Sequence, residues 1–145
     1  MSNPKVAVLL ATYNGAAHCE TQLISILWQR SVDVHVYARD DGSRDTTPAI
    51  LRAWAERHPE QMTIIDNEGV STGSANGNFF VLLGAIDPEP YDYVAFADQD
   101  DVWTPDKLVR SVDRLVQDGA EGYSSDLIAY ETAANSAWVL RKAGH

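Results

Sequence analysis

Four short apolar segments, separated by stretches with helical periodicity, constrain the fold of this chain more than any other feature. The first, residues 5–11, is a continuous run rich in branched residues, as in a strand buried on both faces. Similar segments follow at residues 32–38, 62–65 and 93–97. Strands that alternate with helices predict an α/β protein with a mostly parallel sheet, helices on both faces and right-handed crossovers.

Helical periodicity fills the intervals between these strands. The predicted helices cover residues 16–29, a segment capped by Thr46 or Thr47 with Pro48 near its first position, residues 79–86, and the segment that Pro105 starts. Beyond Gly119 the pattern weakens. Residues 127–130 and 137–140 predict two more strands, which could form a hairpin.

Polar turns follow the predicted strands. They are residues 12–15, 40–45, 69–78 and 98–101. In parallel α/β sheets, ligands bind beyond the carboxyl ends of the strands, so the fold would gather these turns at one edge. This convergence is the main reason, from the residues alone, to expect a binding site.

Three carboxylates crowd four positions at the end of the fourth predicted strand: Asp98, Asp100 and Asp101. Carboxylates this close repel one another, so one pKa should rise or the group should share a cation. A hard divalent ion with oxygen ligands suits them best. The alternative is a solvated acidic turn before a helix, because acidic residues also favour helix starts.

The other turns carry weaker signals. Glycine and small residues at 69–78 would let a ligand approach the backbone, and the amides could meet phosphate or ribose oxygens, although a surface loop explains them equally well. Asp41 could accept hydrogen bonds from a base N–H or a ribose hydroxyl, whereas Asp45 and Thr46 favour capping. Tyr13 could stack on a base, although packing at a strand end is the commoner role.

Composition narrows the function further. The formal charge of −10 and a pI near 4.6 argue against a nucleic-acid partner, but a metal at the acidic cluster would still allow a phosphorylated small molecule. The single cysteine, Cys19, excludes an internal disulfide and favours a buried structural thiol. The apolar run at residues 6–11 is too short for a signal-peptide core or a membrane span. We therefore expect a cytoplasmic protein, in solution or at the inner face of the membrane.

Several motifs of other nucleotide, metal and hydrolase sites are missing. No G-x-G-x-x-G follows the first strand, and the sequence has no P-loop and no G-x-S-x-G elbow. The acidic run also fails as an EF-hand, because Val102 stands at the third ligand position. The four histidines show no metal-ligand spacing.

Five segments in order carry a resemblance to a known family. They are residues 8–15, residues 22–27 with Gln29, residues 40–45, residues 73–80, and residues 96–103 with 105–108. Together they resemble the nucleotide-sugar-binding half of a family 2 glycosyltransferase with the GT-A fold, and within it the bacterial rhamnosyltransferase-like group. The resemblance covers roughly the first 115 residues.

The resemblance implies a GT-A-type (Rossmann-like) sheet with a D-x-D metal site. Asp98 would lie near the ribose and the metal, and Asp100 would bind Mg²⁺ or Mn²⁺ on the diphosphate directly. Asp41 matches the aspartate that members of the family use against the nucleobase. The full set of expected substrate-binding residues is Ala11, Thr12, Tyr13, Asn14, Asp41, Asn78 and Asp98.

The implied reaction transfers a sugar from a dTDP-, UDP- or GDP-linked donor to a hydroxyl of a glycan or other acceptor, with a metal and with inversion. No residue is assigned as the general base. Residues 1–145 would form one nucleotide-sugar-binding domain, truncated on its C-terminal side, where members of the family continue into the acceptor-side part. An exposed sheet edge could then support a homodimer.

Two alternatives remain open. One is a truncated, non-catalytic nucleotide-sugar-binding module. The other, a sugar-nucleotide pyrophosphorylase, is disfavoured because residues 11–15 replace the G-x-G-T-R loop expected there.

Overall fold

The computed structural model describes residues 2–125, 127–131 and 135–141. It divides into two compact units, residues 1–108 and residues 109–145. The first unit contains the sheet and all the polar turns that the sequence singles out.

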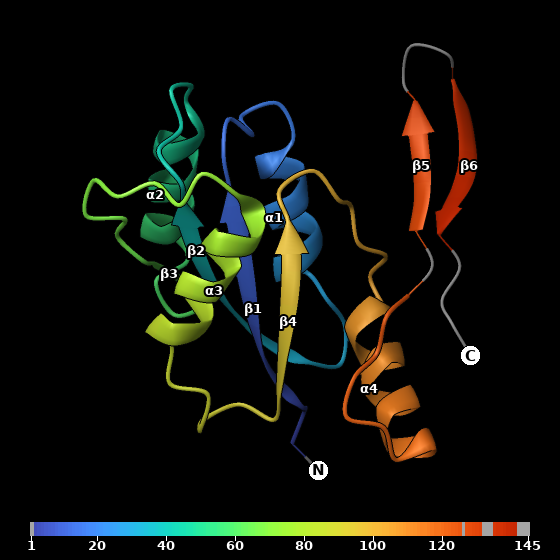
Figure 1. Ribbon diagram of the computed structural model, residues 1–145. Coiled ribbons are helices and arrows are strands. Elements are labelled where there is room, and N and C mark those ends of the chain that lie inside the picture. The colour runs from blue at the N-terminus through green and yellow to red at the C-terminus, as the bar shows by residue number, and fades with distance from the viewer. Residues whose placement is uncertain (1, 126, 132–134, 142–145) are drawn as a thin grey trace. The chain divides into compact units, whose positions relative to one another are not determined.

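A four-stranded parallel sheet forms the centre of the first unit (Figure 1). Its strands are β1 (Lys5–Thr12), β2 (Asp33–Asp40), β3 (Met62–Ile64) and β4 (Tyr93–Asp98), in the order β3-β2-β1-β4. The predicted strands and their parallel arrangement are therefore confirmed. β4 is an outer strand of this sheet, and its Phe96 is 55% exposed. The homodimer expected from an open edge stays a prediction.

Helices cover both faces of the sheet, as predicted. They are α1 (Cys19–Leu27), α2 (Thr47–Arg57) and α3 (Ala75–Ala85), and α4 (Lys107–Asp118) spans the boundary of the two units. Figure 1 shows α3 on one face, with α1 and α2 on the other. Seven of the eight residues of β1, Val6 to Thr12, are buried, because both faces of this central strand are covered.

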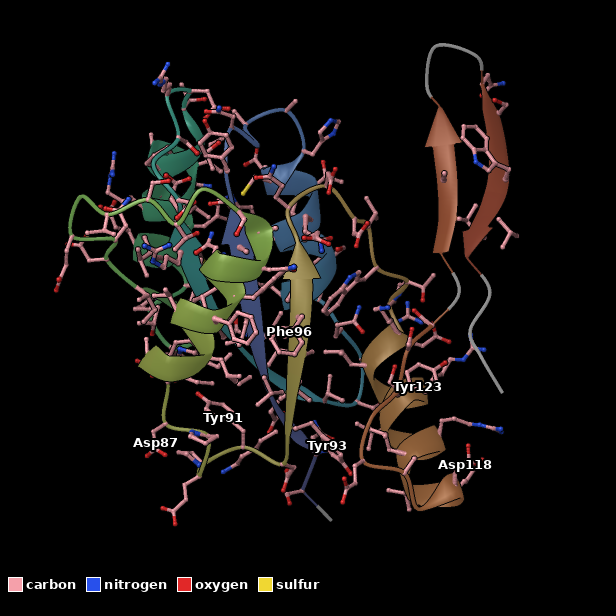
Figure 2. All side chains as sticks on the ribbon, viewed as in Figure 1. Asp87, Tyr91, Tyr93, Phe96, Asp118 and Tyr123 are labelled. Atoms are coloured by element: carbon pink, nitrogen blue, oxygen red, sulfur yellow. The ribbon has the colours of Figure 1, made fainter. Side chains whose placement is uncertain are left out.

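The core under α3 combines aliphatic and aromatic side chains. Ala7, Leu9 and Ala11 of β1 form a buried cluster with Leu82 of α3 and with Ile86, which follows the end of α3. The rings of Phe79 and Phe96 meet edge to face at 5.4 Å, and the hydroxyls of Tyr37 and Tyr91 lie 2.9 Å apart. Tyr91 and Phe96, which take part in these contacts, are labelled in Figure 2. These contacts fix α3, and with it the helix start that carries Asn78, on the sheet.

Two helix starts differ from the sequence prediction. The first helix begins at Cys19 rather than at residue 16, because the carbonyl of Gly15 accepts the N–H groups of His18 and Cys19 in a turn. The third begins at Ala75 rather than at residue 79, because the hydroxyl of Ser74 caps it by accepting the N–H of Gly77. The predicted loop at 69–78 is therefore shorter, and Asn78 belongs to a helix.

The start of α2 confirms Asp45 as a capping residue, as predicted, but not Thr46. Thr46 occupies the N-cap position, but its side chain makes no capping hydrogen bond. The carboxylate of Asp45 instead accepts the N–H and the hydroxyl of Thr47 at 3.0 and 2.6 Å.

The predicted structural role of Cys19 fits its environment, since the residue is buried and burial raises the pKa of its thiol to about 12.

The second unit contains the remainder of α4 and an antiparallel hairpin of β5 (Leu127–Glu131) and β6 (Ser136–Arg141). The hairpin expected from the sequence is therefore confirmed. Over the described ranges of the chain, no helix has the length and apolar character to cross a lipid bilayer.

Candidate functional site

Three parallel strands end side by side at one edge of the sheet. Thr12 of β1 pairs in register with Asp40 of β2, and Ala11 pairs with Asp98 of β4. The polar turns that follow these strands therefore begin at the same edge, as the sequence predicts.

The turn after β1 is held by side chains from the turns after β2 and β4. The backbone N–H groups of four consecutive residues donate to side chains, at 2.7 to 3.0 Å. The pairs are Tyr13 to Gln99, Asn14 to Ser43, Gly15 to Thr47 and Ala16 to Asp45. Asn14 takes a left-handed backbone conformation, with φ of 48°. Tyr13 is 53% exposed, so its side chain is not part of the core and is accessible to a ligand.

Asp41 lies under the segment that precedes α3. Its carboxylate accepts hydrogen bonds from Arg39 at 2.9 Å, from the hydroxyl of Ser71 at 3.1 Å, and from the backbone N–H groups of Thr72 and Gly73 at 2.7 and 2.9 Å. The hydroxyl of Thr72 lies 3.0 Å both from this carboxylate and from the carbonyl of Ser74, and donates its one proton to either. Burial raises the pKa of Asp41, but these hydrogen bonds outweigh it and lower the pKa to about 2. The carboxylate of Asp41 is therefore ionised at neutral pH, and its oxygens accept hydrogen bonds from within the protein.

Arg39 and Asn78 complete this buried network. The guanidinium of Arg39, a residue only 2% exposed, donates to the side-chain oxygen of Asn78 at 2.8 Å and to the carbonyl of Val70 at 2.7 Å. The amide nitrogen of Asn78 donates to the backbone carbonyls of Arg39 and Thr12 at 3.1 and 3.4 Å. Asn78 thus joins the ends of β1 and β2, and its amide is used within the protein.

The acidic turn after β4 has the opposite electrostatics. Partial desolvation by the surrounding protein, followed by the charge of Asp100, raises the pKa of Asp98 above its ordinary value, although part of the residue is exposed. Burial also raises the pKa of Asp101, with further contributions from Asp98 and Asp100, against the opposing charge of Lys107. Ionisation of these carboxylates therefore costs free energy, and a bound cation would lower that cost.

Asp98 and Asp100 suit a divalent cation that also binds a ligand. Both are exposed, and both offer the carboxylate oxygens that Mg²⁺ and Mn²⁺ prefer. Mg²⁺ in particular is usually held by one or two carboxylates together with substrate phosphates. Among the described residues, no group of three or more His, Cys, Asp or Glu side chains is placed to hold a metal ion.

Gln99 joins the acidic turn to the turn after β1. Its side-chain amide accepts the N–H of Tyr13 at 2.7 Å and donates to the Tyr13 carbonyl at 2.8 Å. A Cβ atom at Gly15 would overlap the end of the Gln99 side chain, so a larger residue there would force Gln99 out of this position. The sequence analysis missed this role, because a glutamine between two aspartates has no pattern that distinguishes it from a solvated residue.

The segment that follows the acidic turn is tied to α1. The side chain of Gln29 accepts the N–H of Leu108 at 2.9 Å and donates to the carbonyl of Thr104 at 2.7 Å. The hydroxyl of Ser25 accepts the N–H of Trp103 at 3.1 Å. These bonds hold the C-terminal side of the acidic turn, as Gln99 holds the turn itself.

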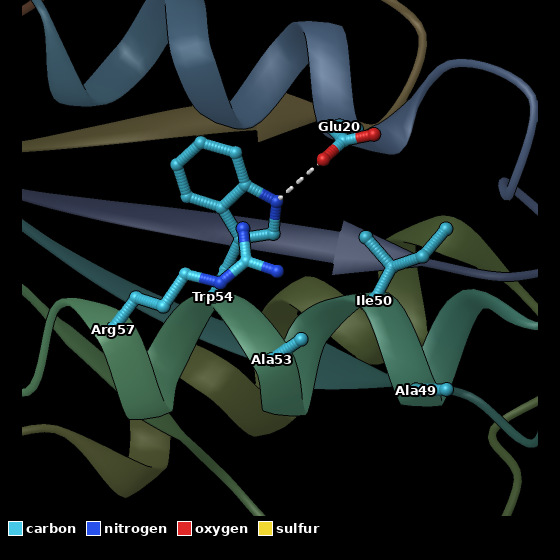
Figure 3. Close-up of a pocket in the computed structure, with 6 residues that line it drawn as sticks. All are labelled: Glu20, Ala49, Ile50, Ala53, Trp54 and Arg57. Atoms are coloured by element: carbon cyan, nitrogen blue, oxygen red, sulfur yellow. Dashed lines mark hydrogen bonds between the residues drawn. The ribbon is translucent and has the colours of Figure 1, made fainter.

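A surface pocket elsewhere in the first unit is lined by α1 and α2. Figure 3 shows its residues, which are Glu20, Ala49, Ile50, Ala53, Trp54 and Arg57. The indole N–H of Trp54 donates to Glu20 at 3.3 Å and joins the two helices. The lining includes no residue of the strand-end turns, so this pocket is separate from the candidate site.

Comparisons with known proteins agree with this geometry. The model of the family described as "Glycosyl transferase family 2" matches residues 7–143. The chain is 40% identical over 121 residues to the dTDP-rhamnosyl transferase RfbG of Shigella flexneri, and the match covers 83% of this chain and 42% of that protein. It is 30% identical over 118 residues to the succinoglycan biosynthesis protein ExoO of Rhizobium meliloti (strain 1021), covering 81% and 32%.

Solved structures support the same fold. The mannosyltransferase PcManGT from Pyrobaculum calidifontis, in complex with GDP-Man and Mn²⁺, matches with a TM-score of 0.65 and 31% identity over 79% of this chain and 33% of that one. S. aureus TarS residues 1–349 in complex with UDP matches with a TM-score of 0.64 and 21% identity, over 78% and 32%, a likeness of fold alone. The predicted GT-A-type fold is thus confirmed. The chain spans less than half the length of each relative named here.

Proposed function

The chain belongs to glycosyl transferase family 2, and from this we propose that it is the donor-binding domain, residues 1–145, of a metal-dependent glycosyltransferase. The observation that carries the proposal is the meeting of Tyr13, Asp98 and Asp100 at one edge of the sheet, joined by the Gln99 side chain. An accessible aromatic ring next to exposed carboxylates that repel one another suits a nucleoside diphosphate bound with a cation, with the base near the ring and the phosphates near the acidic turn.

The donor residues divide between two ends of the site. Under this proposal the base pocket is formed by the strand end and turn of β1, by Asp41 and by the start of α3. The residues concerned are Ala11, Thr12, Tyr13, Asn14, Asp41 and Asn78. Asp98 contributes at the ribose end, next to the acidic turn.

Asp98 and Asp100 would hold Mg²⁺ or Mn²⁺, and the raised pKa of Asp98 supports this assignment. When bound, such an ion neutralises charge that develops on the departing nucleoside diphosphate. The carboxylates orient the diphosphate end of the donor, while the bonds of Gln99, Gln29 and Ser25 keep the acidic turn in one position. The relative solved with GDP-Man and Mn²⁺ supports a divalent ion.

We propose a dTDP-linked sugar as the donor, because the relative with 40% identity is a dTDP-rhamnosyl transferase. UDP- and GDP-linked sugars are the competing donors, since neighbours of the same fold are solved with UDP and GDP-Man. The sugar would pass to a hydroxyl of a glycan acceptor with inversion, in the biosynthesis of a surface polysaccharide. The general base of that step is assigned to no residue of this chain.

A second reading is a module that binds the nucleotide sugar without transferring it. We consider it because no described residue of the chain is assigned as the general base of the transfer. Transfer of sugar to a glycan acceptor by the chain on its own would exclude this reading.

The proposal is tested by a thermal-shift titration with dTDP, UDP and GDP, each with Mn²⁺, with Mg²⁺ and with EDTA. A ligand at a hundred times its dissociation constant stabilises a protein by about 2.7 kcal/mol, which is measurable in a small domain. Stabilisation by dTDP above the other two, and only with metal, supports the proposal. No shift with any nucleotide in any metal contradicts it.

A further inference from the structure

Gln99 stands between the two carboxylates proposed to hold the metal, yet its side chain bonds to the other end of the donor site. Its amide oxygen accepts the N–H of Tyr13 at 2.7 Å, and its amide nitrogen donates to the Tyr13 carbonyl at 2.8 Å. One side chain therefore holds both peptide groups of Tyr13. Because a residue has only two soft backbone dihedrals, these two bonds together restrict the φ and the ψ of Tyr13.

We propose that Gln99 is a positioning residue that couples the two ends of the donor site. When Asp98 and Asp100 bind a cation with the diphosphate, the backbone between them loses freedom, and Gln99 then holds Tyr13 more firmly for contact with the base. This inference rests on the proposed donor site and specifies how its two ends depend on each other. The coupling is reciprocal, so a bound base also strengthens binding of the diphosphate with its metal.

The contact between Gln99 and Tyr13 continues the strand pairing beyond the end of the sheet. Ala11 of β1 pairs with Asp98, the last residue of β4. Gln99 directly follows that pair, and its side-chain amide supplies the donor and the acceptor that a neighbouring strand would otherwise offer. The acidic turn and the base end are thus joined at the first residue after the strands part.

A glycine leaves the space that the Gln99 side chain occupies. A Cβ atom at Gly15 would overlap the Oε1 and Cδ atoms of Gln99. The N–H of Gly15 donates to the hydroxyl of Thr47 at 2.9 Å, so its backbone is held from the turn after β2. Gln99 is half-buried beside this buried glycine, and its amide therefore has a defined place in the site.

The far end of the turn after β1 is attached to a different part of the site. The N–H of Ala16 donates to Asp45, in the turn after β2, at 3.0 Å. A change at the acidic turn should therefore reach Tyr13 through Gln99 and leave Ala16 unaffected. The competing account is a purely structural bond, which holds the two turns together equally well whether or not the donor site is occupied.

Amide hydrogen exchange, measured residue by residue by NMR, separates the two accounts. The probe is inorganic diphosphate with Mg²⁺, which has no base, and the chain is compared with and without it. Coupling predicts exchange at the Tyr13 amide slower by about threefold or more with the probe, and unchanged exchange at the Ala16 amide. Equal exchange at Tyr13, in a sample where the Asp98 and Asp100 resonances show the probe bound, would overturn the inference.

A double-mutant cycle on dTDP affinity with Mn²⁺ provides a second test. Gln99→Ala should lower the affinity about fivefold in the parent chain but less than about twofold in Tyr13→Ala, because the base contact that Gln99 supports is already lost there. Gln117→Ala, on the exposed side of α4, is the matched control and should change the affinity in neither background. Equal losses from Gln99→Ala in the two backgrounds would contradict the coupling.

The donor site and the coupling fail in different ways. If the parent chain binds no nucleoside diphosphate with Mn²⁺ or Mg²⁺, the donor site itself is wrong and the inference falls with it. If the parent binds dTDP with metal and either test shows the two ends to be independent, the donor site stands and only the role of Gln99 is wrong. If inorganic diphosphate leaves the resonances of the acidic turn unchanged, the double-mutant cycle decides.

Discussion

Two groups of carboxylates lie at the same edge of the sheet, and their surroundings are opposite. Asp41 is buried, paired with Arg39 and saturated by hydrogen bonds, and its pKa falls to about 2. Asp98 and Asp101 lie in a turn of like charges, where burial and neighbouring carboxylates raise the pKa of each. The protein already compensates the charge of Asp41, whereas the carboxylates of the acidic turn raise one another's pKa, with Lys107 as the opposing charge at Asp101.

The contrast shows that residue type alone does not identify a ligand-binding carboxylate. Both groups follow parallel strands, and both belong to motifs that the family resemblance highlights. Of these two groups, the acidic turn is the one whose negative charge a bound cation would stabilise. We therefore propose the acidic turn, rather than Asp41, as the place where a metal binds.

Loss of Arg39 should have the largest effect. Arg39→Met leaves the buried Asp41 without its ion-pair partner, and removal of one member of a buried pair typically costs about 3–5 kcal/mol. Urea unfolding measures the loss. Arg114→Met is the control, because its pair with Asp118 is about half exposed and should contribute about 0.5 kcal/mol or less. Similar losses in the two variants would show that the Asp41 network is not the stabilising element we infer.

Loss of Asp100 should abolish metal-dependent nucleotide binding while leaving the fold intact. Asp100→Ala removes a proposed metal ligand from an exposed turn, so the unliganded melting temperature should stay near that of the parent. The stabilisation by dTDP with Mn²⁺, about 2.7 kcal/mol at a hundred times the dissociation constant, should disappear in a thermal-shift assay. Asp113→Ala on α4 is the exposed control. A full shift in Asp100→Ala would contradict the metal assignment.

Acid should weaken the Asp41 network selectively. The folded-state pKa, about 2, lies below the ordinary value of 3.8, so the carboxylate stabilises the fold above pH 3.8 and loses that contribution as the pH falls through about 2. In urea unfolding between pH 6 and pH 2, the stability difference between the parent and Asp41→Asn should therefore be constant at the upper end and shrink at the lower end. A difference that is independent of pH would mean that the charge of Asp41 contributes nothing.

Loss of the Gln99 side chain should have the smallest effect of these changes. Gln99→Ala removes two hydrogen bonds between the acidic turn and Tyr13. Because the pair is exposed, we expect a loss of about 1 kcal/mol, or about fivefold in dTDP affinity with Mn²⁺. Calorimetric titration measures it, with Gln117→Ala on the exposed side of α4 as the control. Unchanged affinity would show that the two turns bind the donor independently.

The fold and the location of the site were predictable from the sequence. Apolar periodicity marked the six strands of the described residues, and the parallel arrangement of β1 to β4 followed from the alternation with helices. The convergence of the turns followed in turn from that arrangement, as the register of Thr12 with Asp40 and of Ala11 with Asp98 confirms. These features depend on patterns that each segment carries by itself.

The hydrogen bonds that connect the residues of the site were not predictable, because they join residues far apart in the chain. Arg39 and Asn78 are 39 residues apart, and Gln99 and Tyr13 are 86 apart. Nothing in the local sequence of either partner indicates the pairing. The early start of α3 was missed for a different reason, since glycine and small polar residues at 73–77 favour a loop unless tertiary contacts select the helix.

The most direct test of the central claim is calorimetric titration of dTDP into the parent chain, once with saturating Mn²⁺ and once with EDTA. The account predicts binding with Mn²⁺ and a loss of at least a hundredfold in affinity with EDTA, because the carboxylates of the acidic turn repel the diphosphate when no cation is present. Equal affinity in the two titrations would contradict it. The nucleotide would then be held without the metal that Asp98 and Asp100 are proposed to bind.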